Sequence, residues 1–347
     1  MSKIVLGIET SCDDTSIALI EFGKTEFPRI LAHCHFGQEE VLKKWGGVVP
    51  EIAARNHLEK ITPLLKSAFD QAEIMPENLD LIGVTTHPGL LGPLLTGLNA
   101  AKTLSLLYKT PIVPVNHLYA HLEAIFLTEE ITYPYLGILV SGGHSMFLLA
   151  HSSTHFEVLG STIDDAAGEA FDKGGKLMNL GYPAGKVIDD LAKESSLDQF
   201  EFPIGLKSSA DANLSYSGLK TSLRTLIEKD PTVLNKDKIG ALCASYQDAI
   251  VKAIKLKLRY AYQIALEKTE RYELPIVLGG GVACNSYLRS VISRQHESTH
   301  IVKPSFCTDN GAMIANYAHR VRETAVPFPA TLELDAKNRF VSKRKKA

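Results

Sequence analysis

The sequence lacks the cysteine pattern of a disulfide-rich or thiolate-zinc protein. Its five cysteines form no C-x-x-C pair and leave one odd, which suits a reducing compartment. No apolar run approaches the roughly 18 residues of a membrane-spanning helix, and the N-terminal apolar run is too short for a signal peptide. We therefore expect a cytoplasmic protein with no membrane segment.

An excess of positive charge is also absent. Lys and Arg number 37 against 39 Asp and Glu, for a formal net charge of -2, so no global basic field would attract nucleic acid. The one basic run is the tail over residues 342–347 (SKRKKA). That composition predicts a disordered end, with an RNA contact as the alternative. Contact with nucleic acid therefore needs a local patch or a partner.

The familiar phosphate-binding loops are missing as well. No G-x-x-x-x-G-K-[ST] occurs, and residues 279–284 (GGGVAC) have Cys284 where G-x-G-x-x-G places its third glycine, so neither a Walker nor a Rossmann site is predicted. This run follows an apolar strand and precedes Asn285, the expected N-cap of a helix over 286–292. Its backbone amides could face a nucleotide while the Asn285 amide reads a base or ribose. The alternative is a plain glycine turn with a capping asparagine.

What the sequence does contain is a repeated strand plan. Residues 4–20 and 135–150 each show an apolar strand, a polar turn and a second apolar strand, and further apolar strands precede helical stretches. This alternation indicates an α/β fold, and the duplicated hairpin indicates two similar lobes with a cleft between them. We place the boundary at residue 130. The lobe 1–130 carries the histidine helix; the lobe 131–347 carries the glycine-rich loops and Asp309, and its last helix can pack back on the first lobe.

Two histidines four residues apart, His117 and His121, lie on one face of a predicted helix. One metal ion could bind both, as in the H-E-x-x-H helix of zinc proteases, but Leu118 stands where that motif has its glutamate base. Core or helix-surface histidines are the alternative. Asp309, near the start of the last long helix, is the candidate third ligand, although an N-cap is its commoner role. Two histidines and a carboxylate with open positions suit Fe(II) or Zn(II).

A further segment is dense in acids and glycines. Residues 164–175 (DDAAGEAFDKGG) are followed by residues 181–185 (GYPAG) and by Asp189. Glycine costs backbone entropy unless an unusual conformation or a close approach requires it. A ligand-binding loop is therefore favoured over a purely structural stretch.

Several motifs occur in order along nearly the whole chain and together resemble one family. That family is the universal tRNA N6-adenosine threonylcarbamoyltransferases, TsaD in bacteria, once described as glycoproteases. The resemblance implies the two-lobed fold of actin, sugar kinases and chaperone ATPases, with duplicated ribonuclease-H-like lobes. Leu139 stands where archaeal and eukaryotic relatives carry a tyrosine, so the chain looks like the bacterial branch. The motifs are GIETSCDDTS (7–16), GGVVPEIAARNH (46–57), the histidine pair, LVSGGHS (139–145), DDAAGEAFDK (164–173), YSGLKT (216–221), GGGVACN (279–285) and CTDNGAMIA (307–315).

The resemblance implies transfer of a threonylcarbamoyl group from threonylcarbamoyl-AMP to N6 of the adenosine following the anticodon, in tRNAs reading codons that start with A. It implies a metal held by His117, His121 and Asp309; we expect one Fe(2+) per subunit, with Zn(2+) as the alternative. Asp13, at the first hairpin tip, is the candidate base, with a turn carboxylate as the alternative. The residues implied for the activated substrate are Leu139, Val140, Ser141, Gly142, Gly143, Asp172, Gly185, Asp189 and Asn285.

The resemblance also implies partners. Bacterial relatives act with an inactive paralogue (TsaB type) and a P-loop ATPase (TsaE type), and a separate enzyme makes the adenylate. Three other functions remain open at this point: a metal-dependent ATPase or small-molecule kinase of the same fold, a metalloprotease, and a non-catalytic scaffold. The presence of all three metal ligands argues against the scaffold.

Overall fold

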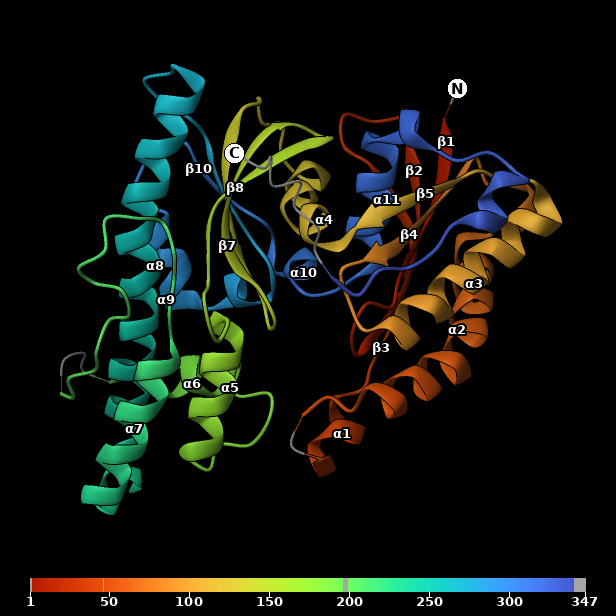
Figure 1. Ribbon diagram of the computed structural model, residues 1–347. Coiled ribbons are helices and arrows are strands. Elements are labelled where there is room, and N and C mark those ends of the chain that lie inside the picture. The colour runs from red at the N-terminus through yellow and green to blue at the C-terminus, as the bar shows by residue number, and fades with distance from the viewer. Residues whose placement is uncertain (1, 46, 196–198, 340–347) are drawn as a thin grey trace. The chain divides into compact units, whose positions relative to one another are not determined.

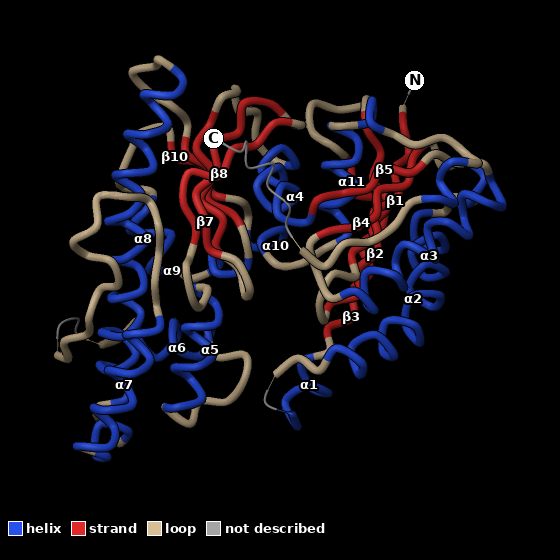
Figure 2. Tube along the Cα trace, in the orientation of Figure 1, coloured by secondary structure: helices blue, strands red, loops and turns tan. Residues whose placement is uncertain are grey.

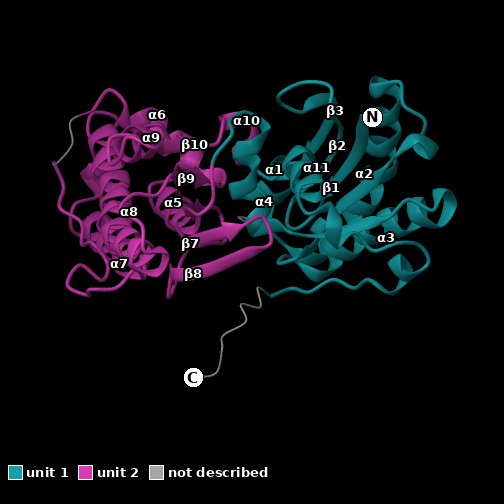
Figure 3. Ribbon diagram, turned by 90° about the horizontal axis from the view of Figure 1, so that it is seen from above, with its two compact units in different colours: residues 1–131, 308–347 teal, residues 132–307 magenta. Residues whose placement is uncertain are grey.

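The computed structural model describes residues 2–45, 47–195 and 199–339 (Figure 1). Helices and strands are mixed along this length (Figure 2). The chain divides into two compact units, residues 1–131 with 308–347 and residues 132–307 (Figure 3). The basic run at 342–347, predicted to be disordered, lies outside the described residues.

The first unit is built on a five-stranded sheet in the order β3-β2-β1-β4-β5. β1, β2 and β3 are antiparallel neighbours, whereas β4 pairs in parallel with β1 and with β5. The strands are β1 (Lys3–Glu9), β2 (Asp14–Phe22), β3 (Arg29–Gly37), β4 (Leu81–His87) and β5 (Ile112–Asn116). The α-helices are α1 (Glu39–Leu42), α2 (Pro50–Ala72), α3 (Leu91–Tyr108), α4 (His117–Glu123) and α11 (Gly311–Arg320).

The second unit has a five-stranded sheet in the order β10-β9-β6-β7-β8. Its strands are β6 (Tyr135–Val140), β7 (Ser145–Ser152), β8 (His155–Ser161), β9 (Ile276–Gly279) and β10 (Thr299–Ile301). Its α-helices are α5 (Ala167–Leu177), α6 (Gly185–Ala192), α7 (Ser217–Lys229), α8 (Ile239–Thr269), α9 (Ser286–Ile292) and α10 (Pro304–Cys307). Short 3-10 helices complete the two units: η1 (Lys43–Trp45), η2 (Pro76–Asn78), η3 (Ala124–Leu127), η4 (Pro231–Leu234), η5 (Gly281–Cys284), η6 (Arg322–Thr324) and η7 (Ala330–Glu333).

The two sheets repeat one topology. In each, three consecutive antiparallel strands are joined by two later strands that run parallel to the first of them. The two predicted hairpins are β1–β2 and β6–β7, each at the start of its sheet. The prediction of a duplicated α/β plan is therefore confirmed.

Alternation along β1 decides which helices cover each face of the first sheet. Leu6 and Ile8 join a core cluster with residues of α2 and α3, among them Ile61. Gly7 points to the opposite face, where a Cβ would lie 2.0 Å from the Gly311 carbonyl oxygen. Because no side chain fits there, α11 packs directly on the sheet, opposite α2 and α3 (Figure 1).

The packing of α11 corrects the division made from the sequence. The first unit ends at Ile131, next to the expected boundary, but residues 308–347 belong with it. Ser16 Oγ on β2 accepts the Gly311 backbone N–H at 2.9 Å, and Arg320 at the other end of α11 pairs with Glu123 at 2.7 Å. Asp309 therefore belongs to the first unit, although the sequence placed it in the second lobe.

No helix in the described part of the chain combines the length and the apolar character that a bilayer crossing requires.

Candidate metal centre and glycine-rich loops

The local sequence after β5 sets the direction of the histidine helix. Asn116 is the N-cap of α4, and its Oδ1 accepts the backbone N–H of Leu118 at 2.9 Å and of Tyr119 at 3.3 Å. The cap begins the helix at His117 and places His121 one turn later on the same face. The predicted helix over this pair is confirmed.

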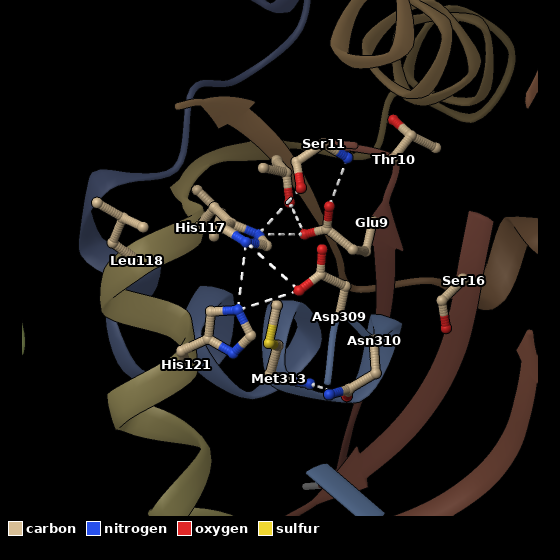
Figure 4. Close-up of polar contacts among 12 residues, drawn as sticks. Glu9, Thr10, Ser11, Ser16, His117, Leu118, His121, Asp309, Asn310 and Met313 are labelled. Atoms are coloured by element: carbon tan, nitrogen blue, oxygen red, sulfur yellow. Dashed lines mark hydrogen bonds and ion pairs between the residues drawn. The ribbon is translucent and has the colours of Figure 1, made fainter. Parts of the chain in front are cut away.

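Three ligand atoms converge from α4 and from the residue before the N-cap of α11 (Figure 4). His121 Nε2 lies 3.1 Å from Asp309 Oδ1 and 3.2 Å from His117 Nε2. His117 Nε2 lies 3.6 Å from Asp309 Oδ1. Two ligand atoms that each lie about 2.0–2.2 Å from the same ion are separated from each other by distances close to those between these three donor atoms.

Asp309 is not the cap of the last helix. Asn310 takes that role, because its Oδ1 accepts the Met313 backbone N–H at 2.8 Å. The capping alternative for Asp309 is therefore wrong. Its carboxylate points toward the two histidines instead (Figure 4).

The other ring nitrogen of His117 faces a buried carboxylate that the sequence analysis did not single out. His117 Nδ1 lies 3.0 Å from Glu9 Oε2 and 3.2 Å from Ser11 Oγ. Glu9 Oε2 also accepts the Thr85 hydroxyl at 2.6 Å, and Oε1 accepts the Ser11 backbone N–H at 2.5 Å. Burial would raise the pKa of Glu9, but His117 and Ser11 outweigh it and lower that pKa.

These contacts make the site a fit for a metal ion. With its hydrogen donated from Nδ1 to Glu9, His117 presents an Nε2 lone pair to His121 and Asp309. Electron-pair donors so close together repel one another unless a cation lies among them. A proton is one such cation: burial lowers the pKa of His117, yet Glu9 and Asp309 raise it overall to about 9. Two imidazoles and a carboxylate are also a donor set of Fe(II) and Zn(II) sites.

Asp13 lies in the turn between β1 and β2. Burial, followed by the charges of Asp14 and Asp309, raises the pKa of the Asp13 carboxyl to about 6. His57, fully buried on α2, holds this turn, since its Nε2 lies 3.1 Å from the Cys12 carbonyl oxygen. The sequence analysis also missed His57, whose partner is distant in sequence.

In the second unit, the parallel strands β6 and β9 end side by side. Leu139 of β6 pairs with Gly279 of β9. The next residue, Gly280, has φ 94°, and a Cβ on it would lie 2.4 Å from the Val140 carbonyl oxygen. Only glycine fits this close approach of the two strand ends. Crevices outside the carboxyl ends of parallel strands are the usual ligand sites of open α/β sheets.

The turn after β6 lies on the first turn of α5. The backbone N–H of Gly168 donates to the Ser141 carbonyl at 3.2 Å, and that of Glu169 donates to the Gly142 carbonyl at 3.2 Å. A Cβ added to Gly142 or Gly143 would meet nothing within 4 Å. Two carbonyl groups therefore hold the turn against α5, and the space beside Gly142 and Gly143 is open.

The predicted acids of this unit hold loops in place. Asp172 Oδ1 accepts the Ala184 backbone N–H at 2.8 Å, immediately before Gly185 begins α6. Asp189, on α6, accepts the backbone N–H of Ser286 at 3.1 Å and its hydroxyl at 2.9 Å. The two carboxylates thus link α5, α6 and the start of α9.

Asn285 is the N-cap of α9, as predicted. Its Oδ1 accepts the Leu288 backbone N–H at 2.8 Å, and its Nδ2 donates to Gln247 Oε1 at 2.8 Å. An asparagine amide has two hydrogens and two oxygen lone pairs. One amide hydrogen and one oxygen lone pair of Asn285 therefore remain beyond these two contacts.

Comparison with known proteins identifies the family. The model of the family "TsaD: tRNA N6-adenosine threonylcarbamoyltransferase" matches residues 29–316. The chain belongs to this family. A tRNA N6-adenosine threonylcarbamoyltransferase of Anaeromyxobacter sp. (strain Fw109-5) is 45% identical over 318 residues, covering 90% of this chain and 92% of the relative. Another from Thermosipho africanus is 42% identical over 337 residues, covering 95% and 98%.

Solved structures confirm the fold class. Full-length HypF in its phosphate- and nucleotide-bound form gives a TM-score of 0.56 at 15% identity, covering 92% of this chain and 46% of HypF. The activator of 2-hydroxyisocaproyl-CoA dehydratase from Clostridium difficile with bound ADPNP gives 0.51 at 13%, covering 96% and 99%. Both are ATPase-fold proteins of the actin type, as the sequence resemblance implied.

The family establishes the activity. The chain is a transferase that places a threonylcarbamoyl group on N6 of adenosine in tRNA, forming t6A. The kinase and protease alternatives are not favoured. The family is metal-dependent, and the chain carries a candidate His-His-Asp metal site.

Proposed function

We propose that this transferase takes its threonylcarbamoyl group from threonylcarbamoyl-AMP, and that His117, His121 and Asp309 hold one metal ion per subunit. The convergence of their three donor atoms within the first unit supports the metal proposal. Fe(2+) is the proposed ion, with Zn(2+) as the alternative. When bound, the ion would supply Lewis-acid stabilisation of charge on oxygens of the donor substrate.

The glycine-rich loops of the second unit are the proposed adenylate site. Leu139, Val140, Ser141, Gly142 and Gly143 end β6 and form its turn, which is open at the two glycines. The loops held by Asp172, Asp189 and Asn285, with Gly185 at the start of α6, would complete it. A mixed carbamic-phosphoric anhydride already contains its leaving group, AMP. The protein therefore needs to hold and orient the donor and to receive one proton.

Asp13 is the proposed base. Attack of the adenosine N6 amine on the carbamoyl carbon forms the new N–C bond, breaks the bond to AMP and releases one proton from N6. A carboxyl whose pKa is raised to about 6 is largely ionised at neutral pH and is a better proton acceptor than an ordinary aspartate. Proton uptake by Asp13 would balance the step.

The charge balance supports a need for partners. Few clustered cations mean few phosphate contacts, so the isolated chain should bind tRNA weakly. We propose that an inactive paralogue (TsaB type) and a P-loop ATPase (TsaE type) act with it, and that it works in the cytoplasm.

The test uses unmodified tRNA, threonylcarbamoyl-AMP labelled in the threonine, and the chain with and without these two partners. The expected result is label in tRNA, with release of AMP and no need for ATP as a group donor. Transfer of label from labelled threonine and ATP, with no activity on the purified adenylate, would show that the donor is wrong.

A further inference from the structure

Glu9 occupies a place in the site that its strand dictates. Side chains alternate along β1, so Glu9 points to the same face as Gly7, the face covered by α11. Parallel pairing of β1 with β4 joins Ile8 to Val84 and brings Thr85 beside Glu9. The chain therefore places a carboxylate behind the histidine helix, where it is 0% exposed.

We infer that Glu9 is a positioning residue for the metal ligand His117: its carboxylate holds the hydrogen on His117 Nδ1 and so presents the Nε2 lone pair to the ion. The inference rests on the proposed metal site at His117, His121 and Asp309. Glu9 is not itself a ligand in this arrangement: its carboxylate contacts Nδ1 of His117, whereas His121 and Asp309 lie near Nε2, and the group of converging ligand atoms is formed by His117, His121 and Asp309.

The hydrogen-bond pattern supports this role. A backbone N–H can only donate, so Glu9 Oε1 must accept from Ser11, and Thr85 donates its hydroxyl to Oε2. Oε2 then faces His117 Nδ1 at 3.0 Å as an acceptor. The donors come from two other positions in the unit, so the carboxylate cannot rotate without losing them. Carboxylates behind metal-bound histidines fix the tautomer and raise ligand basicity.

The second histidine lacks such support. His121 Nδ1 is buried and has no hydrogen-bond partner among the described residues. No described protein group therefore accepts a hydrogen on His121 Nδ1. If Glu9 is lost, neither imidazole has a carboxylate at its Nδ1, so the effect on metal affinity should be large for a residue that touches no metal.

The experiment measures Zn(2+) affinity of the full-length chain by chelator competition for the wild type, Glu9→Gln, Glu9→Asp and His121→Ala. Glutamine keeps the shape but offers an N–H₂ group as well as one oxygen, so it can donate to Nδ1 and favour the wrong tautomer. Loss of an outer partner of this kind typically costs roughly 10–100-fold in metal affinity. We expect that loss for Glu9→Gln and partial recovery for Glu9→Asp.

A matched control is Glu123→Gln. Glu123 is also fully buried, lies on α4 itself and pairs with Arg320 at 2.7 Å. Its replacement removes a buried carboxylate from the histidine helix without touching His117 Nδ1. Stability should fall in this variant, while Zn(2+) affinity should stay within a few-fold of wild type.

A second readout needs no variant. In the zinc-loaded wild-type protein, imidazole nitrogen NMR should show His117 bound through Nε2 with a hydrogen-bonded proton on Nδ1. Binding through Nδ1 would overturn the inference, and so would a Glu9→Gln protein with wild-type affinity while His121→Ala binds no zinc. Wild-type affinity in His121→Ala would instead overturn the metal site itself.

Discussion

Replacing Gly7 by alanine should damage the metal centre from a distance. The added Cβ would lie 2.0 Å from the Gly311 carbonyl oxygen and 2.6 Å from the Ala315 backbone nitrogen. Ordinary carbon–oxygen contacts need more than 3 Å, roughly, so α11 must move away from β1 by about 1 Å. Overpacking of this kind costs about 1–3 kcal/mol of unfolding free energy.

The same movement reaches Asp309, which lies two residues before Gly311. Metal ligands tolerate errors of only about 0.2 Å, so a displacement of about 1 Å should lower Zn(2+) affinity at least tenfold. The matched control is Gly218→Ala on α7, where a Cβ would meet nothing within 4 Å. The assays are urea unfolding and chelator competition. Wild-type stability and zinc affinity in Gly7→Ala would refute the reasoning.

Three further predictions follow from the second unit, from His319 and from the charge balance. Asn285→Ala and Asp172→Ala should weaken binding of a non-hydrolysable adenylate analogue roughly tenfold or more, because each variant loses a hydrogen bond that holds a loop. Metal content should not change. Unchanged affinity by calorimetry in both variants would remove these two residues from the site. Burial and two arginines lower the pKa of His319 from 6.5 to about 4 in the folded chain. As the pH falls, His319 therefore becomes protonated in the unfolded chain at a higher pH than in the folded chain. Its contribution to stability is complete above about pH 6.5 and is lost as the pH falls toward 4. His319→Phe retains a ring beside Phe22 and should lose less unfolding free energy than the wild type between those pH values, as measured by urea unfolding. An equal loss in the two proteins would contradict the assignment. The chain alone should bind tRNA weakly with a shallow salt dependence and turn over only with its partners; tight binding with sustained turnover by the isolated chain would show otherwise.

Local signals in the sequence predicted the elements that depend on neighbours in the chain. The apolar and polar alternation located both hairpins, and the asparagine before residues 286–292 located the start of α9. The spacing of His117 and His121 placed them on one helix face, as the structure shows. Each of these depends on contacts within a few residues.

Contacts between distant segments were beyond the sequence. Asp309 was assigned to the second lobe because it follows that lobe in the chain. Packing of the last helix on the first lobe was only a possibility from the sequence, and the close fit of Gly7 against Gly311 places α11 in the first unit. Glu9 entered the sequence analysis only as part of the motif at residues 7–16. Its role depends on parallel pairing of β1 with β4 and on the approach of α4, which no local pattern encodes.

The most direct test removes metal from the purified chain with a chelator, restores Fe(2+) or Zn(2+), and measures bound metal and t6A formation with partners, adenylate and tRNA. About one ion per chain should restore modification, as expected for two imidazoles and a carboxylate with open positions. His121→Ala and Asp309→Ala should bind no ion and form no t6A, while the control His151→Ala, on the second unit, should match wild type. Full modification by a metal-free His121→Ala, Asp309→Ala double variant would contradict the proposed metal centre.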